Sequence, residues 1–285
     1  MENLCALAII QARMGSSRLP GKVLLDIGGE PMLARVVERA RRATTLNGVM
    51  VATTDDPSDD PVARLCEERG YAFHRGSVHD VLDRYYHASH SQNADLIVRI
   101  TADCPVIDPA LIDRTVLAYI GEIQPQDEVL SRRAPSSELP PAPGPFDFAA
   151  NRLPPPFHRT FPIGLDVEVC SASVLDYAWE HAQEKHQREH VMPYLYETTG
   201  RFNVLLVNHK TDLGTLRWTV DAPEDLELLR RIYAHFGNRD DFSWLDVLDL
   251  WRKESELAEI NENIKHKSVF DVDQRNNRPQ RKEKS

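Results

Sequence analysis

The sequence contains few cysteines and no long apolar run. No two of its four cysteines have C-x-x-C spacing, which argues against a zinc knuckle or a dithiol redox motif. The first residues show no basic start followed by a long apolar stretch, so we expect no signal peptide. No run is long enough to span a bilayer. We therefore expect a cytoplasmic protein without a membrane partner.

The chain also lacks an excess of basic residues. Its 285 residues carry 34 Lys and Arg against 44 Asp and Glu, a formal net charge of −10. A general nucleic-acid binder normally shows a basic footprint, so nucleic acid is not an expected partner. The hydrophobic content of 41% and charged content of 27% are typical of a globular protein.

Three well-known catalytic and nucleotide-binding motifs are absent. The sequence has no G-x-x-x-x-G-K-[ST] loop, no G-x-G-x-x-G fingerprint and no G-x-S-x-G elbow. These absences argue against a P-loop NTPase, a dinucleotide-binding protein and a serine hydrolase of the α/β-hydrolase type.

What the chain does have is a cationic loop directly after its first apolar run. Residues 6–12 are typical of a strand buried on both faces, and Arg13, Arg18 and Lys22 follow within ten residues. The small residues between them allow close backbone approach, and the cations offset negative charge. This combination predicts a polyphosphate site. The alternative, a solvated basic turn, rarely follows a buried strand with so many cations.

Four strand–helix units are predicted in the first part of the chain. The strands are residues 6–12, 48–53, 71–74 and 95–101, and the helices are 31–43, 58–69, 78–91 and 109–119. Right-handed crossovers would place these strands in one parallel sheet with helices on both faces, so we expect an α/β fold. Ligands of such sheets bind at the carboxyl ends of the strands.

The pattern changes after residue 120. Residues 121–145 contain six prolines, which predicts a surface insertion or mobile loop without regular structure. Further strands are expected at 164–170, 202–207 and 216–220, and helices after Ser171 and at 223–235 and 242–252. Residues 265–285 are polar and predict a mobile tail.

Two acids follow strand-like runs at distant points in the chain. Asp103 comes just after the strand at 95–101, and Asp221 just after the one at 216–220. If those strand ends adjoin, the two carboxylates can hold one Mg²⁺, which prefers a few carboxylates plus substrate phosphates. Alternatively, Asp103 is a turn residue and Asp221 caps the following helix. Together with the cationic loop, we favour the metal interpretation.

Other polar residues carry weaker signals. Asp166 and Glu168 share one side of a predicted strand, and on spacing alone a solvent-facing edge explains them better. Residues 188–190 fit a helix start. Arg217 stands between Leu216 and Trp218, from where it can point into a cleft.

Residues 9–22 closely resemble the signature of the cytidylyltransferases that make CMP-activated sugar acids. More closely still, the chain resembles the spore coat polysaccharide biosynthesis protein F family. The shared stretches are residues 51–54, 80–86, 99–105, 164–169, 188–191 and 216–221. The resemblance covers nearly the whole chain to about residue 264 and departs from it in the Pro-rich insertion and the tail.

The resemblance implies a Rossmann-like, glycosyltransferase-A-like nucleotidyltransferase fold, with a mixed, mostly parallel sheet and a smaller acceptor and dimerisation subregion. Residues 1–264 would form one domain, with a nucleotide-binding half at 1–120 and an acceptor-side half at 146–264. The implied reaction transfers CMP from CTP, with Mg²⁺ as cofactor and release of pyrophosphate. The acceptor would be a sugar acid or a phosphate- or phosphonate-bearing molecule in surface polysaccharide or related glycan biosynthesis. Members are often homodimers.

The resemblance also implies roles for particular residues. Arg13 and Lys22 would hold the CTP phosphates and act in catalysis, and Asp103 and Asp221 would hold Mg²⁺. The other implied nucleotide-side residues are Gln11, Ala12, Gly15, Ser16, Arg18, Thr53, Asp80, Arg84 and Thr101. The implied acceptor-side residues are Arg99, Asp166, Glu168, Arg188, Glu189, His190 and Arg217.

Two other functions stay open at this point. A nucleotide-sugar glycosyltransferase would share the fold, but its usual Asp-x-Asp motif is not seen, since Asp103 stands alone. A non-catalytic nucleotide-binding protein would keep the cationic loop and lose the metal acids, so the presence of both Asp103 and Asp221 argues against it.

Overall fold

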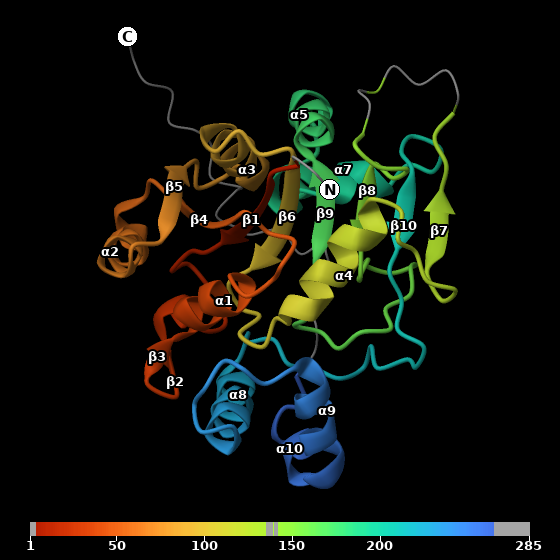
Figure 1. Cartoon of the computed structure of the whole chain (residues 1–285). Helices are drawn as coiled ribbons and strands as arrows, with labels where there is room; N and C mark the ends of the chain where they lie inside the picture. The colour runs from red at the N-terminus through yellow and green to blue at the C-terminus, as the bar shows by residue number, and fades with distance from the viewer. Residues whose placement is uncertain (1–3, 135–138, 140–141, 265–285) are drawn as a thin grey trace.

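The computed structural model describes residues 4–134, 139 and 142–264 (Figure 1). Its first half builds a parallel sheet from four strands, β1 (Ala6–Gln11), β4 (Gly48–Thr54), β5 (Ala72–Gly76) and β6 (Leu96–Thr101). They lie in the order β5-β4-β1-β6, and each pair is parallel. The predicted α/β arrangement is therefore confirmed.

Four strands from the second half extend the sheet beyond β6. They are β9 (Glu168–Ser171), β8 (Phe148–Ala150), β10 (Val204–Leu206) and β7 (Glu128–Ser131), in that spatial order. Strand β9 runs antiparallel to β6 and β8, and β7 runs antiparallel to β10. The result is the mixed, mostly parallel eight-stranded sheet of the expected fold. A separate hairpin consists of β2 (Asp26–Ile27) and β3 (Glu30–Pro31).

Helices cover both faces of this sheet. One core contains side chains of α1 (Met32–Ala40), α2 (Asp60–Arg69) and α4 (Pro109–Tyr119), and the other contains those of α3 (Val81–Ser91) and α5 (Ala172–His181). Strand β1 alternates between the two, because Ala8 and Ile10 join the first core and Leu7 and Ile9 the second.

The remaining helices are short or lie at one end of the molecule. Two 3-10 turns, η1 (Lys22–Leu24) and η2 (Pro57–Asp59), follow strand ends. Two short helices follow, of which α6 (Lys185–His190) packs against α3 and α7 (Pro193–Tyr196) packs against α6. Three helices, α8 (Pro223–His235), α9 (Trp244–Lys253) and α10 (Glu256–Ile260), group together at one end (Figure 1). No helix in the described ranges combines the length and the apolar character needed to cross a membrane.

Several predicted segments differ from the structure. The segment 121–145 was expected to be irregular, yet β7 forms between its prolines and pairs with β10. The strand expected at 164–170 begins only at Glu168, because the Asn151 side chain binds the backbone before it, donating to Leu165 O at 2.6 Å and accepting from the Val167 N–H at 2.8 Å. The strand expected at 216–220 makes only an isolated bridge between Ile163 and Arg217. The predicted mobile tail lies outside the described residues.

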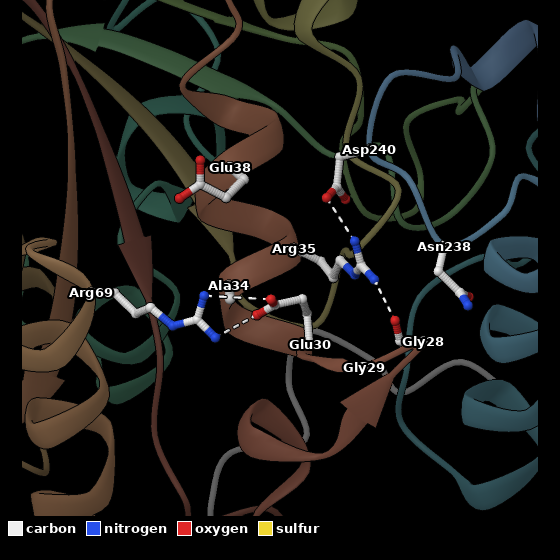
Figure 2. Close-up of a pocket in the computed structure, with 9 residues that line it drawn as sticks. All are labelled: Gly28, Gly29, Glu30, Ala34, Arg35, Glu38, Arg69, Asn238 and Asp240. Atoms are coloured by element: carbon white, nitrogen blue, oxygen red, sulfur yellow. Dashed lines mark hydrogen bonds and ion pairs between the residues drawn. The ribbon is translucent and has the colours of Figure 1, made fainter.

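Arg35 of α1 fixes the hairpin that follows the cationic loop. Its guanidinium donates to the carbonyl oxygens of Ile27 (3.1 Å) and Gly28 (2.9 Å) and pairs with Asp240 (2.7 Å), as Figure 2 shows for Gly28 and Asp240. Gly28 has φ +63°, and a Cβ there would fall 2.2 Å from the amide oxygen of Asn238. Gly28 and Gly29 line the pocket drawn in Figure 2, so one side of this pocket is a turn that the hydrogen bonds of Arg35 hold in place.

Candidate active site

The ammonium of Lys22 lies between the two acids that the sequence singled out. Its Nζ donates to Asp103 Oδ2 at 2.7 Å and to Asp221 Oδ1 at 2.9 Å. A third donor proton reaches the carbonyl oxygen of Val220 at 2.7 Å. The structure therefore brings together the cationic loop and two carboxylates that are far apart in the chain.

The backbone of the cationic loop is held by specific contacts. Gly21 has φ +72°, a conformation that suits glycine, and its N–H donates to the carbonyl of Met14 at 2.8 Å. The N–H of Met14 in turn donates to Asp59 Oδ1 at 2.6 Å, which ties the loop to η2. The loop thus folds back on itself and presents Lys22 at the start of η1.

Asp103 follows the end of β6 and is oriented by its neighbours. Thr101 Oγ1 donates to Asp103 Oδ1 at 2.6 Å, so the other carboxylate oxygen faces Lys22. The backbone carbonyl of Asp103 accepts from Val220 N (2.9 Å) and Thr219 Oγ1 (3.0 Å). These contacts hold residues 219–220 beside the end of β6 and so place Asp221 close to Asp103.

The Asp221 carboxylate faces the site and does not cap α8. The N–H groups of Asp221 and Ala222 donate instead to Asp225 Oδ2, at 2.9 and 3.0 Å. Arg18 and Arg217 both pair with Asp221 Oδ2 at 2.8 Å, opposite the oxygen that Lys22 contacts. The helix-cap alternative for Asp221 is therefore wrong, and its place is taken by the buried Asp225.

The charges at this point stabilise one another. Burial tends to lower the pKa of Lys22, but the carboxylates of Asp103 and Asp221 outweigh it and raise that pKa. Burial likewise tends to raise the pKa of Asp221, but Lys22, Arg217 and Arg18 hold it well below its usual range. Lys22 is therefore an ammonium and Asp221 a carboxylate at neutral pH.

The donor set fits a hard cation that shares its ligands with a substrate. Oxygens of Asp103 and Asp221 contact one nitrogen, so one cation can contact both. Within the described ranges, no group of three or more His, Cys, Asp or Glu side chains is arranged to hold a metal. Two carboxylates with remaining positions for phosphate oxygens and water match the preference of Mg²⁺.

A second cationic feature, Arg84, lies near Arg13 of the cationic loop. Arg84 is 2% exposed, its Nη1 donates to the carbonyl of Ser77 at 2.7 Å, and its Nε has no hydrogen-bond partner among the described residues. Burial and the positive charge of Arg13 lower the pKa of Arg84 to about 10. Gly76 leaves room for this side chain, since a Cβ there would lie 3.0 Å from Arg84 Cγ.

Other residues to which the resemblance assigns a nucleotide-side role lie at the ends of β1 and β4 and in the cationic loop. Gln11 Oε1 accepts from Arg99 Nε at 3.1 Å, and Ser16 Oγ accepts from the Leu19 N–H at 3.3 Å. Thr53 is fully buried at the end of β4, and its Oγ1 has no partner in the described ranges. Ala12 continues β1, its N–H donating to Ala52 O at 3.0 Å, and Gly15 lies in the loop beyond it.

Asp166 and Glu168 are enclosed and paired, so a solvent-facing edge is wrong. Asp166 pairs with Arg159 at 2.6 Å and with Arg152 at 3.2 Å. Burial tends to raise the pKa of Asp166, but these two arginines hold it well below the usual range. Glu168 is 3% exposed and pairs with Arg99. Three arginines and two carboxylates thus form one cluster, with an excess of positive charge.

Residues 188–190 end a helix and do not begin one. Arg188 Nε donates to Asp80 Oδ2 at 2.8 Å, while Asp80 Oδ1 accepts from the Asp83 N–H and caps α3. Glu189 is 8% exposed and approaches Arg13, with 3.9 Å between Oε1 and Nη2. The chain segment of α6 therefore contacts both the start of α3 and the cationic loop.

His190 is followed by a strained turn. Val191 is buried with φ +71° and ψ −59°, and the Met192 N–H donates to the His190 carbonyl at 2.8 Å. This is the rarer γ-turn, which is costly for a β-branched residue. Such strain persists only where surrounding packing imposes it, as at binding sites.

Residues 186–190 also have the spacing H-x-x-E-H of some zinc enzymes. The structure does not assemble such a centre. His186 Nε2 contacts Glu197 Oε1 at 2.6 Å, and Glu189 faces Arg13. This agrees with the lack of a three-ligand metal cluster in the part of the chain that the structure describes.

Several partners of the site were not found from the sequence. Arg152 and Arg159 stand in a Pro-rich stretch without periodicity, so nothing local marked them. Asp225 fits a helix first turn, but it is fully buried and accepts from Arg217 Nε (2.9 Å) and Nη2 (3.0 Å). Asn261, beyond α10, donates to the same carboxylate at 2.8 Å.

The comparisons with known proteins identify the family of the chain. A protein-family model described as "Cytidylyltransferase" matches residues 7–270. The uncharacterized protein MJ1063 of Methanocaldococcus jannaschii is 35% identical over 272 residues, 94% of this chain and 99% of that protein. The spore coat polysaccharide biosynthesis protein SpsF of Bacillus subtilis is 28% identical over 88% of this chain and 96% of its own length.

A solved structure shows the same arrangement. A cytidylyltransferase from Leptospira borgpetersenii serovar Hardjo-bovis superposes with a TM-score of 0.78 at 30% identity, covering 93% of this chain and all of that one. The fold and the matches together define a nucleotidyltransferase. The chain belongs to the cytidylyltransferase family, which confirms the resemblance seen in its sequence.

Proposed function

We propose that this protein is a Mg²⁺-dependent cytidylyltransferase that transfers CMP from CTP to a small anionic acceptor and releases pyrophosphate. The observation that carries the proposal is the meeting of Lys22, Asp103 and Asp221 at one point, at the end of the cationic loop. In open α/β sheets this edge, at the carboxyl ends of the strands, is where ligands bind.

Each group at this point has a role in the proposed reaction. Asp103 and Asp221 would hold Mg²⁺, which when bound neutralises charge on the phosphates. Arg13, Arg18 and Lys22 bind the triphosphate oxygens. Because Arg18 and Arg217 also contact Asp221, they fix the carboxylate that would hold the metal.

The remaining nucleotide-side residues position these groups. Thr101 orients Asp103 through its hydroxyl, and Gly15 and Ser16 shape the turn that brings the cations round. Gln11, Ala12 and Thr53 form the floor beside it at the ends of β1 and β4. Asp80 and Arg84 lie near one another, and Arg84 lies close to Arg13 of the cationic loop.

The chemistry needs positioning and charge more than covalent help. An acceptor oxygen attacks the α-phosphorus of CTP, the bond from that phosphorus to the β-phosphate bridging oxygen breaks, and pyrophosphate leaves. Arg13 and Lys22 offset the negative charge that builds on the leaving group. An ionised phosphate or phosphonate acceptor would need no general base.

The charge of the neighbouring cluster supports an anionic acceptor. Arg99, Arg152 and Arg159 outnumber Asp166 and Glu168 there. Arg188, Glu189, His190 and Arg217 would complete the acceptor side. By analogy with the named relative SpsF, we place the product in surface polysaccharide or related glycan synthesis. A cytoplasmic homodimer is part of the same proposal.

The test is release of pyrophosphate from CTP against a panel of sugar acids, phosphorylated metabolites and phosphonates, with Mg²⁺ present. We expect release with one class of anionic acceptor and formation of a CMP-linked product. Release of a nucleoside diphosphate from a nucleotide sugar, with no pyrophosphate from CTP, would identify a glycosyltransferase and contradict the proposal.

A further inference from the structure

The Lys22 ammonium has a complete set of protein acceptors. An ammonium carries three N–H donors, and Lys22 places one on Asp103, one on Asp221 and one on the carbonyl of Val220, all within 2.9 Å. Its side chain is only 11% exposed. The group therefore sits where a cation held by Asp103 and Asp221 would sit.

A divalent metal and this ammonium cannot share that position. Mg²⁺ needs oxygen ligands at about 2.1 Å, whereas the ammonium already contacts the same carboxylate oxygens. Two like charges at such short range also repel strongly. A metal can therefore enter between Asp103 and Asp221 only if the Lys22 ammonium moves away.

Moving the ammonium is costly unless another anion receives it. Removing one partner from an enclosed ion pair leaves an uncompensated charge, which is strongly unfavourable. A triphosphate supplies several anionic oxygens next to the cationic loop. The flexible four-carbon stem of lysine lets the ammonium turn toward them while Gly21 and the backbone of η1 stay in place.

We propose that Lys22 is a resident counter-cation, which keeps divalent metal out of the Asp103–Asp221 site until a nucleoside triphosphate draws its ammonium away. The metal then enters with the nucleotide and does not precede it. This inference rests on the proposed function, since it takes a triphosphate to be the ligand of the loop.

If Lys22 competes with the metal and binds the nucleotide, removing its charge should raise the affinity for the metal and lower the affinity for the nucleotide. Arg18 offers a matched control, because it also pairs with Asp221, at 2.8 Å, but does not lie between the two carboxylates. Arg18→Met removes one positive charge from the same carboxylate and leaves the Lys22 ammonium in place.

The experiment measures binding of Mn²⁺ alone, from the loss of the electron paramagnetic resonance signal of the free ion, with no CTP present. For Lys22→Met we expect an affinity for Mn²⁺ at least about tenfold above that of the wild type, because no ammonium then occupies the position between the two carboxylates. Arg18→Met should gain less than about threefold. Adding Asp103→Asn to Lys22→Met should abolish the gain.

Circular dichroism and thermal unfolding check that each variant folds, and Lys22→Gln replaces Lys22→Met if the latter does not. Equal gains in the Lys22 and Arg18 variants would overturn the proposal, because they would indicate only a general change in charge. No gain in a folded Lys22 variant would overturn it too.

A wild-type measurement gives an independent test. The account expects the wild type to bind Mn²⁺ alone no more tightly than its Asp103→Asn variant does. Tight wild-type binding of Mn²⁺ that Asp103→Asn abolishes would overturn the proposal without any Lys22 variant. Pyrophosphate is not measured here, so failure of this test leaves the proposed reaction standing, and failure of the reaction assay leaves this test valid.

Discussion

The ammonium of Lys22 and the carboxylate of Asp221 lie 2.9 Å apart, although 199 positions separate them in the chain. This contact joins the first and the second half of the chain. Lys22 comes from the loop after β1, and Asp221 from the residues that lead into α8. The first prediction below concerns this contact, and the others concern buried charges elsewhere in the molecule.

Asp103→Asn and Asp221→Asn should each abolish CTP-dependent pyrophosphate release. Each variant removes one of two carboxylates that would hold the metal, and losses of about 10²–10³ in kcat are typical when a group that stabilises developing charge is removed. The measurement is the initial rate of pyrophosphate release. Glu224→Gln is the matched control, because it removes an exposed carboxylate from the first turn of α8 and should keep the rate. Full activity in either Asp variant would refute the metal assignment.

Arg84→Met should change stability and nucleotide binding in opposite directions. The Arg84 Nε has no partner in the described ranges, and Arg13 repels the guanidinium. Replacing such a buried charge with an apolar side chain should raise the free energy of unfolding by about 1 kcal/mol. The increase in melting temperature that CTP produces should shrink. Arg84→Lys keeps the charge, and an equal loss in that variant would point to geometry and not to charge alone.

Asp166→Asn should destabilise the protein by about 3 kcal/mol, the low end for breaking an enclosed ion pair. The variant leaves Arg152 and Arg159 without their shared carboxylate. Urea unfolding at neutral pH gives the value. A loss below about 0.5 kcal/mol, the size typical of surface substitutions, would contradict the structure at this position.

Asp166 also makes the free energy of unfolding depend on pH in the acid range. The arginines depress the pKa of Asp166 in the folded chain below its value of about 3.9 in the unfolded chain. The unfolded chain therefore binds the proton first, and the contribution of Asp166 is present above about pH 4 and lost as pH falls further. Asp166→Asn should flatten the fall in unfolding free energy below pH 4. An unchanged slope would mean that the pKa of Asp166 is not depressed in the folded chain.

Arg35→Met should destabilise the hairpin β2–β3 that follows Lys22. The substitution removes the guanidinium that donates to the carbonyls of Ile27 and Gly28 and pairs with Asp240. Figure 2 shows its contacts with Gly28 and Asp240. We expect a loss of about 3 kcal/mol in the free energy of unfolding. Arg69→Met is the control, because its pair with Glu30 is exposed and should contribute less than about 1 kcal/mol. Equal losses in the two variants would contradict the difference in burial.

The first half of the fold could be predicted because its signals are local. Apolar strands and helical periodicity repeat four times before residue 120, and right-handed crossovers place such strands in one parallel sheet, as observed. The second half could not be predicted as well. Strand β7 forms between prolines by pairing with β10. Residues 216–220 lie beside the end of β6 but make only an isolated bridge and no strand.

The same contrast holds at the site. Asp103 and Asp221 could be singled out because each follows a strand-like run, and the loop cations because they follow β1. The partners of Asp166 could not, since ion pairs between distant segments leave no pattern in the sequence. Asp225 fits the first turn of a helix, and nothing in the neighbouring sequence predicts that it is buried and accepts a hydrogen bond from Arg217.

A crystal structure with CTP and Mn²⁺, in which anomalous scattering locates the metal, tests the proposed site. The account expects a metal peak in contact with carboxylate oxygens of both Asp103 and Asp221, with the triphosphate against Arg13 and the Lys22 ammonium moved onto it. A metal bound elsewhere, or a nucleotide bound away from the cationic loop, would contradict the account.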